Sequence, residues 1–116
     1  MDSDKSIKAN FERIVYPPLN FAGKKELNRS LFFAEYINTL TWLANPDNQD
    51  IVTYRIYQVR RGTQRFVVEV KATTFMYLHR NVGKNIAESY AIEAVNRDGL
   101  VSAQAFITVQ QIRNKK

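Results

Sequence analysis

The stretch Ser89-Tyr-Ala-Ile-Glu-Ala-Val-Asn-Arg-Asp-Gly99 decides the fold class of this chain. Tyr90, Ile92 and Ala94 stand at every second position, which is the period of a β-strand with one buried face. Residues 96–99, which follow, are of the types that form tight turns. The stretch therefore predicts a half-buried strand that ends in a turn.

Short segments of the same kind lie elsewhere in the chain, rich in β-branched and aromatic residues and separated by turn-forming residues. No proline falls inside any of them, as the missing N–H of proline requires. Turns about 8–12 residues apart are typical of an antiparallel sandwich or barrel. The predicted strands are residues 39–43, 51–59, 65–71, 73–78, 89–95 and, roughly, 103–112, the last with Phe106 or Ile107 turned inward.

Residues 24–38 fit neither the strand pattern nor the helix pattern well. Leu27, Leu31 and Phe32 have helical spacing, but no capping box precedes them. We expect a long connection here, with room for one helical turn, that packs Phe32 or Phe33 against the core.

The composition narrows the class of protein. The chain has 116 residues, with 17 Lys and Arg against 11 Asp and Glu, and so carries a net charge of +6. This length is typical of one domain that is large enough to bury a core. The absence of cysteine excludes disulfides, thiolate zinc sites and a cysteine nucleophile. No apolar run reaches the ~20 residues of a membrane span, and the first fifteen residues lack the pattern of a signal peptide.

Five segments, taken in order, make the chain resemble a fibronectin type III domain. They are Pro17-Pro-Leu-Asn-Phe21 at the first strand, Leu40-Thr-Trp42, Asn45-Pro46, Tyr54-Arg-Ile-Tyr57, and residues 90–99 with Ser102 after them. The resemblance covers residues 17–110 and implies an all-β, immunoglobulin-like antiparallel β-sandwich of about seven strands. The side chains expected to fill the ~10 Å between its sheets are Leu40, Trp42, Tyr54, Ile56, Tyr90 and Ile92.

Three features depart from the pattern of that family. Asn38 stands where an inward apolar residue is usual, so it is either hydrogen-bonded inside or displaced by a bulge. Glu88 stands where the family usually has its corner tyrosine, so that corner is either missing or shifted. The segment from Gly23 to Tyr36 is longer than the usual first connection.

The expected domain spans residues 17–112, followed by a basic tail at residues 113–116. Residues 1–16 are expected to be a linker or the last strand of an upstream neighbour, because residues 9–15 loosely echo residues 105–109. Chance similarity between apolar segments explains the echo equally well. The first alternative implies a fragment of a longer protein, and the missing signal peptide agrees with it.

The sequence offers little for catalysis, and we expect neither an enzyme nor a cofactor. The carboxylates fall mostly at loops or outward strand positions, so we expect them to be solvated. His79 is the single histidine and has no second His or Cys with which to hold a metal, so we expect it at the surface or rim. Residues 47–50 have too few oxygen donors for a calcium loop, and no glycine-rich phosphate loop is present.

The positive charge is concentrated in one stretch. Between Arg55 and Lys84, seven basic residues oppose only Glu69, so this stretch holds +6, the net charge of the whole chain. A patch there could bind an acidic glycan, an anionic surface or nucleic acid, with Tyr57 and Phe75 as stacking partners. Alternatively, basic side chains on a sheet edge deter edge-to-edge aggregation. The candidate patch consists of Arg60, Arg61, Arg65, Arg80 and Lys84.

The resemblance implies a non-catalytic module that works in spacing, presentation or adhesion. Such a module belongs to a larger bacterial protein that is secreted or part of the cell envelope. Its expected partners are neighbouring domains of the same parent chain and, in addition, another protein or a glycan; neither nucleic acid nor a membrane span is expected. The alternative function is that of a basic domain that binds polyanions.

Overall fold

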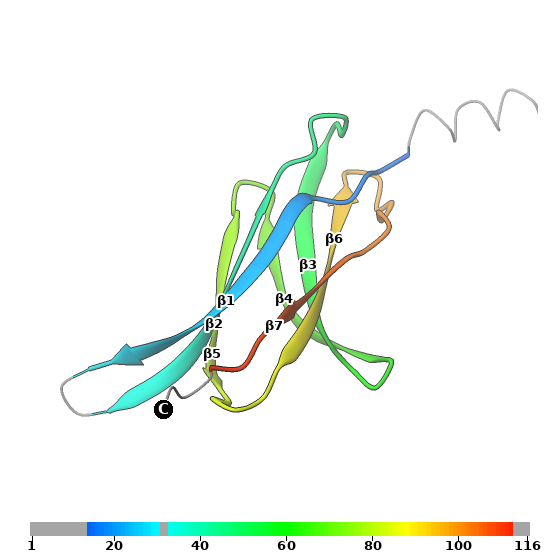
Figure 1. Cartoon of the computed structure of the whole chain (residues 1–116). Helices are drawn as coiled ribbons and strands as arrows, with labels where there is room; N and C mark the ends of the chain where they lie inside the picture. The colour runs from blue at the N-terminus through cyan, green and yellow to red at the C-terminus, as the bar shows by residue number, and fades with distance from the viewer. Residues whose placement is uncertain (1–13, 31–32, 113–116) are drawn as a thin grey trace, which may run out of the picture.

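The computed structural model describes residues 14–30 and 33–112, which form seven strands in two antiparallel sheets (Figure 1). β1 (Leu19–Arg29), β2 (Ala34–Leu43) and β5 (Met76–Val82) form a three-stranded sheet in the order β1-β2-β5. β3 (Ile51–Arg60), β4 (Thr63–Lys71), β6 (Glu88–Asn96) and β7 (Ala105–Val109) form a four-stranded sheet in the order β4-β3-β6-β7. The predicted antiparallel β-sandwich is therefore confirmed.

The core lies between the two sheets and is built from alternate residues of the long strands. Trp42 of β2 lies edge-on to Phe21 of β1 and Tyr54 of β3, with ring centroids 6.5 Å and 5.8 Å away. Such aromatic pairs add about 0.5–1.5 kcal/mol each beyond the area that they bury. The six side chains expected inside all lie in this core and are at most 2% exposed: Leu40, Trp42, Tyr54, Ile56, Tyr90 and Ile92.

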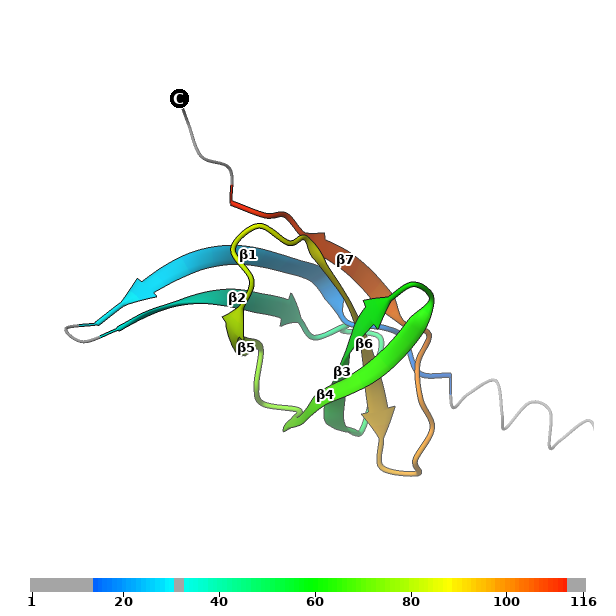
Figure 2. The same cartoon turned by 90° about the horizontal axis from the view of Figure 1, so that it is seen from below.

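Residues 24–38 do not form the predicted connection. Residues 24–29 belong to β1 and residues 34–38 to β2, and these strands pair from Leu19 opposite Leu43 to Arg29 opposite Ala34. Figure 2 shows the resulting hairpin projecting beyond the rest of the three-stranded sheet. Phe33, expected against the core, is 61% exposed, and Phe32 lies outside the described residues.

Two further boundaries differ from the predicted ones. β5 begins at Met76, three residues later than predicted, and continues to Val82, beyond the predicted end at residue 78. The last strand is shorter than predicted and ends at Val109. Of the two candidates for its inward residue, Ile107 packs against the core, whereas Phe106 is 61% exposed.

The two sheets meet along β1 and β7, the edge strands that face each other. A Cβ atom on residue 23 of β1 would lie 2.5 Å from Val109 Cγ2 and 2.8 Å from Ile107 Cδ1. The missing side chain of Gly23 therefore allows this edge to close. In the described part of the chain, no helix is long and apolar enough to cross a membrane.

Candidate functional site

Three of the five predicted patch residues meet at the tip of the β3–β4 hairpin. Arg60, Arg61 and Arg65 line an open hollow of about 260 Å³ together with Gln58 and Thr63. The hairpin closes with a two-residue turn between the paired residues Arg60 and Thr63. We call Arg60, Arg61 and Arg65 the arginine hairpin.

Arg61 occupies a backbone conformation that few side chains adopt readily. Its φ is 53° and that of Gly62 is 78°, as the two central residues of a type I′ turn require. Asparagine or glycine is usual at the first of these positions. None of the three arginines of the hairpin forms an ion pair with another described residue. Among residues 14–30 and 33–112, the three positive charges of the hairpin therefore have no carboxylate partner.

The other two predicted patch residues lie elsewhere. Arg80 belongs to β5, in the opposite sheet, and its Nε donates to Glu35 Oε2 of β2 at 3.0 Å. This hydrogen bond holds the pKa of the Glu35 carboxyl below its usual value. Lys84 lies in the loop between β5 and β6, where its carbonyl accepts from the backbone N–H of Ile112. The structure thus brings together three of the five patch residues. Arg80 is separate from them because it lies in the other sheet and its charge is paired with that of Glu35.

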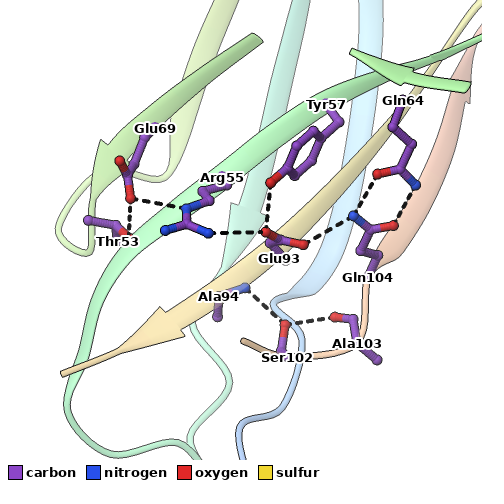
Figure 3. A network of polar contacts seen from close by, with 10 residues as sticks. All are labelled: Thr53, Arg55, Tyr57, Gln64, Glu69, Glu93, Ala94, Ser102, Ala103 and Gln104. Atoms are coloured by element: carbon purple, nitrogen blue, oxygen red, sulfur yellow. Dashed lines mark hydrogen bonds and ion pairs between the residues drawn. The ribbon is translucent and has the colours of Figure 1, made fainter. Parts of the chain in front are cut away.

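A polar network crosses the outer face of the four-stranded sheet (Figure 3). Arg55 Nε donates to Glu69 at 3.2 Å, and Arg55 Nη1 lies 3.8 Å from Glu93. Gln104 Nε2 donates to Glu93 at 3.1 Å, and Gln104 and Gln64 exchange hydrogen bonds of 2.6 and 2.9 Å. Arg55 is therefore neutralised locally, although the sequence counts it with the basic stretch.

The two predicted stacking residues have different surroundings. Tyr57 lies beside this network, where its hydroxyl donates to Glu93 at 2.9 Å and its ring lies 5.9 Å from that of Phe66. Burial, followed by the contact with Glu93, raises the pKa of Tyr57. Phe75 instead packs 6.1 Å from Tyr54. The two rings therefore do not form one stacking platform.

The expectation that the carboxylates are solvated is wrong for three of them. Glu35, Glu88 and Glu93 are only 7–8% exposed. Glu35 faces Arg80, Glu88 faces Lys25, and Glu93 faces Arg55. Sequence reasoning missed them because hydropathy alone cannot show that a partner of opposite charge lies on a neighbouring strand.

Five polar side chains meet inside the sandwich where β1, β2, β5 and β6 come together. We call Lys25, Asn38, His79, Glu88 and Tyr90 the polar cluster. The Lys25 ammonium donates to Glu88 Oε1 at 2.7 Å, to the Ile86 carbonyl at 2.8 Å and to the Gly83 carbonyl. Asn38 Nδ2 donates to the same Glu88 oxygen at 2.7 Å and to the Tyr90 hydroxyl at 2.8 Å.

His79 of β5 is half-buried, which agrees with the expected rim position, and its ring joins this cluster. Its Nδ1 lies 2.5 Å from the Tyr90 hydroxyl. Because that hydroxyl already accepts from Asn38, its own hydrogen can point to Nδ1, and this requires a neutral imidazole. Burial lowers the pKa of His79 and raises that of Tyr90 to about 12. Both groups therefore stay neutral around pH 7.

No group of three or more His, Asp or Glu residues is placed to hold a metal ion within residues 14–30 and 33–112. The candidate sites are therefore the arginine hairpin and the polar cluster.

Several solved structures share this arrangement of strands. The Fn3-like protein from Clostridium thermocellum matches 88% of this chain and 100% of its own, with a TM-score of 0.61 and 19% identity. FN3tt, in a mutant form, matches 82% of this chain and 93% of its own, with a TM-score of 0.61 and 21% identity. The chain has a fibronectin type III fold. The glycoside hydrolase domain structure of Endo-D from Streptococcus pneumoniae R6 matches 84% of this chain but 15% of its own, with a TM-score of 0.62 and 16% identity. No protein-family model and no curated protein matches the sequence.

The polar cluster explains two departures from the fibronectin type III pattern. Asn38 satisfies both alternatives, since it is hydrogen-bonded inside and lies at an irregularity in the β2–β5 pairing. Glu88 stands at the position where the sequence comparison with the family expects the corner tyrosine, whose hydroxyl bonds to backbone a few residues upstream. Here Lys25, held by Glu88, binds the carbonyls of Gly83 and Ile86 instead. An ion pair thus fixes the loop between β5 and β6 to β1.

Proposed function

We propose that this chain is a non-catalytic fibronectin type III module that spaces and presents neighbouring domains of a larger extracellular or cell-envelope protein. One observation carries the proposal: the first and last strands run in the same direction, so the chain enters the sandwich at one end and leaves it at the other (Figure 1). Modules with this path can be joined end to end.

The match to Endo-D supports the same proposal. The present fold corresponds to only 15% of that protein's chain, so a sandwich of this kind occurs there within a much larger polypeptide. A module of 116 residues that adds length without chemistry would fit such a context.

Small-angle X-ray scattering tests the spacing role. We would fuse a folded reporter domain to each end of the chain and compare the product with a fusion through a Gly/Ser linker of equal residue number. The proposal predicts a narrow distribution of reporter separations for the module and a broad one for the flexible linker. Equally broad distributions would contradict a spacing role.

A second candidate function, the binding of a polyanion, is favoured by the arginine hairpin. Its three guanidinium groups surround one hollow and have no described carboxylate partner. Arg61 also holds a positive φ that is unfavourable for its side chain, and such strain is more common at functional sites. The chemistry of the hollow suits sulfate or phosphate groups, which arginine binds through paired N–H donors.

A further inference from the structure

The polar cluster holds a primary amine, a carboxamide and a carboxylate together in the interior. We propose that the Lys25 amine and the Asn38 side chain join in an intramolecular isopeptide bond, with Glu88 as the catalytic acid and base. The bond would link β1 to β2 near the middle of their hairpin.

The geometry places the reacting groups side by side. Lys25 and Asn38 are direct partners in the pairing of β1 with β2, and Asn38 is fully buried. Lys25 Nζ and Asn38 Nδ2 both donate to Glu88 Oε1 at 2.7 Å, so they lie no farther apart than these two bonds laid end to end. The Lys25 side chain is 1% exposed. Two reactants that are held together in this way can react as if one were present at an effective concentration of about 10⁵ M or more.

Burial favours the chemistry as well as the contact. In an apolar interior, a neutral amine beside a neutral carboxylic acid needs less solvation than an ammonium beside a carboxylate. In the first step of the proposed reaction, a proton passes from the Lys25 ammonium to Glu88 and leaves a nucleophilic amine. Asn38 Oδ1 is buried and has no hydrogen-bond partner, so this carbonyl oxygen is available to a donor. Rotation of the amide presents Oδ1 to the newly protonated Glu88.

The step balances without any further reagent. The Nζ lone pair of Lys25 attacks Asn38 Cγ and forms the new C–N bond, while the Glu88 acid stabilises the developing charge on Oδ1. Glu88 then carries a proton from Nζ to Nδ2, the Cγ–Nδ2 bond breaks, and ammonia leaves. The ammonium and the carboxamide become a secondary amide and an ammonium ion. Nothing is oxidised or reduced.

A second cluster on the same hairpin provides a built-in control. Asn28 Nδ2 donates to Glu35 Oε2 at 3.3 Å, and the cation that faces this carboxylate is Arg80. A guanidinium stays protonated in proteins and is no nucleophile. The amide and carboxylate are thus present in both clusters, but only the cluster with Lys25 can form the bond.

Intact-mass spectrometry of the purified, denatured protein tests the proposal. We expect the mass to fall short of the sequence mass by one ammonia, about 17 Da. Trypsin should then fail to cleave after Lys25, and one branched peptide should join residues 25–29 to residues 30–55. The full sequence mass, with free peptides on both sides of Lys25, would overturn the proposal. A loss of ammonia mapped to any other asparagine would overturn it equally.

Variants assign the role of Glu88. Glu88→Gln should restore the full mass, whereas Glu35→Gln in the control cluster should leave the loss of ammonia unchanged. A Glu88→Gln protein that still loses ammonia at Asn38 would contradict the catalytic role of Glu88. Because Glu88→Gln could disturb folding, each variant is checked by the emission of Trp42. Asn38→Ala, which removes the electrophile, provides the second comparison.

Discussion

Gly23 and Val109 touch across the seam where β1 meets β7. A Cβ atom on residue 23 would lie 2.5 Å from Val109 Cγ2 and 3.0 Å from Leu40 Cδ2, closer than ordinary contact allows. The seam joins the strand that enters the module to the strand that leaves it. The packing of these two residues therefore bears on both the stability and the proposed spacing role.

Gly23→Ala should destabilise the fold by about 1–3 kcal/mol, the usual cost of an overpacked core. Gly83→Ala is the matched control, because its added Cβ would meet the end of the flexible Ile86 side chain at 3.1 Å. Urea unfolding followed by Trp42 fluorescence measures both. Equal losses for the two variants would contradict the close packing assigned to Gly23.

Trp42→Ala should lower the free energy of unfolding by about 3–5 kcal/mol, as expected when a large aromatic side chain is removed from a core. Trp42 is 1% exposed, and its indole Nε1 has no hydrogen-bond partner. Trp42→Phe keeps most of the ring contacts and removes that unpaired N–H, so it should lower the free energy of unfolding clearly less than Trp42→Ala does. Circular dichroism during urea unfolding measures both variants. A Trp42→Phe loss as large as that of Trp42→Ala would show that the indole nitrogen is satisfied in solution.

Stability should decrease in mild acid because of His79. Burial holds the pKa of folded His79 below the ~6.5 of an unfolded histidine. As the pH falls through 6.5, the unfolded chain takes up the proton first, so the free energy of unfolding declines until folded His79 is protonated too. His79→Gln should remove this decline between about pH 7 and pH 5, in urea titrations at each pH. Parallel curves for the two proteins would rule out this role for His79.

Removal of the arginine hairpin should weaken binding to a sulfated or phosphorylated polymer. Wild-type protein should be retained on heparin at about 50 mM salt and released by about 200 mM. Arg60, Arg61 and Arg65 changed together to alanine should abolish retention. A second triple variant removes the same charge elsewhere, with alanine in place of Arg29, Lys71 and Arg97. Its retention on heparin should remain close to that of the wild-type protein. If both triple variants bind heparin equally weakly, net charge alone explains the binding. If the wild-type protein is not retained at all, the second function is excluded.

The alternation of apolar residues predicted an antiparallel sandwich or barrel, and the resemblance to a fibronectin type III domain favoured the sandwich. Tyr90, Ile92, Tyr54 and Ile56 lie at strict two-residue spacing on β6 and β3, and all four are buried. Strands with one apolar face show this period directly in the sequence.

The β1–β2 hairpin could not be predicted from the same signal. Its inward positions include Lys25 and Asn38, whose polar side chains interrupt the apolar alternation that marks a half-buried strand. These residues are buried because Glu88, 63 residues from Lys25 in sequence, supplies their partner. A polar group can be buried when a distant partner satisfies it, and the local sequence does not contain that information.

The arginine hairpin was only partly predictable for a related reason. The sequence places Arg60, Arg61 and Arg65 around one glycine turn, which brings them together locally. Whether Arg80 joins them depends on which sheet β5 enters and on the presence of Glu35 beside it. Both depend on pairing between strands far apart in the chain.

The central claim, that the module spaces neighbouring domains between its two ends, is tested most directly by single-molecule pulling. Force applied to the two termini loads β1 and β7 lengthwise, whereas force between residues 62 and 110, both at one end of the sandwich, peels strands apart one at a time. The account predicts one sharp unfolding event through the termini, at several times the force needed in the second geometry. Equal forces in both geometries, or gradual extension through the termini, would contradict it.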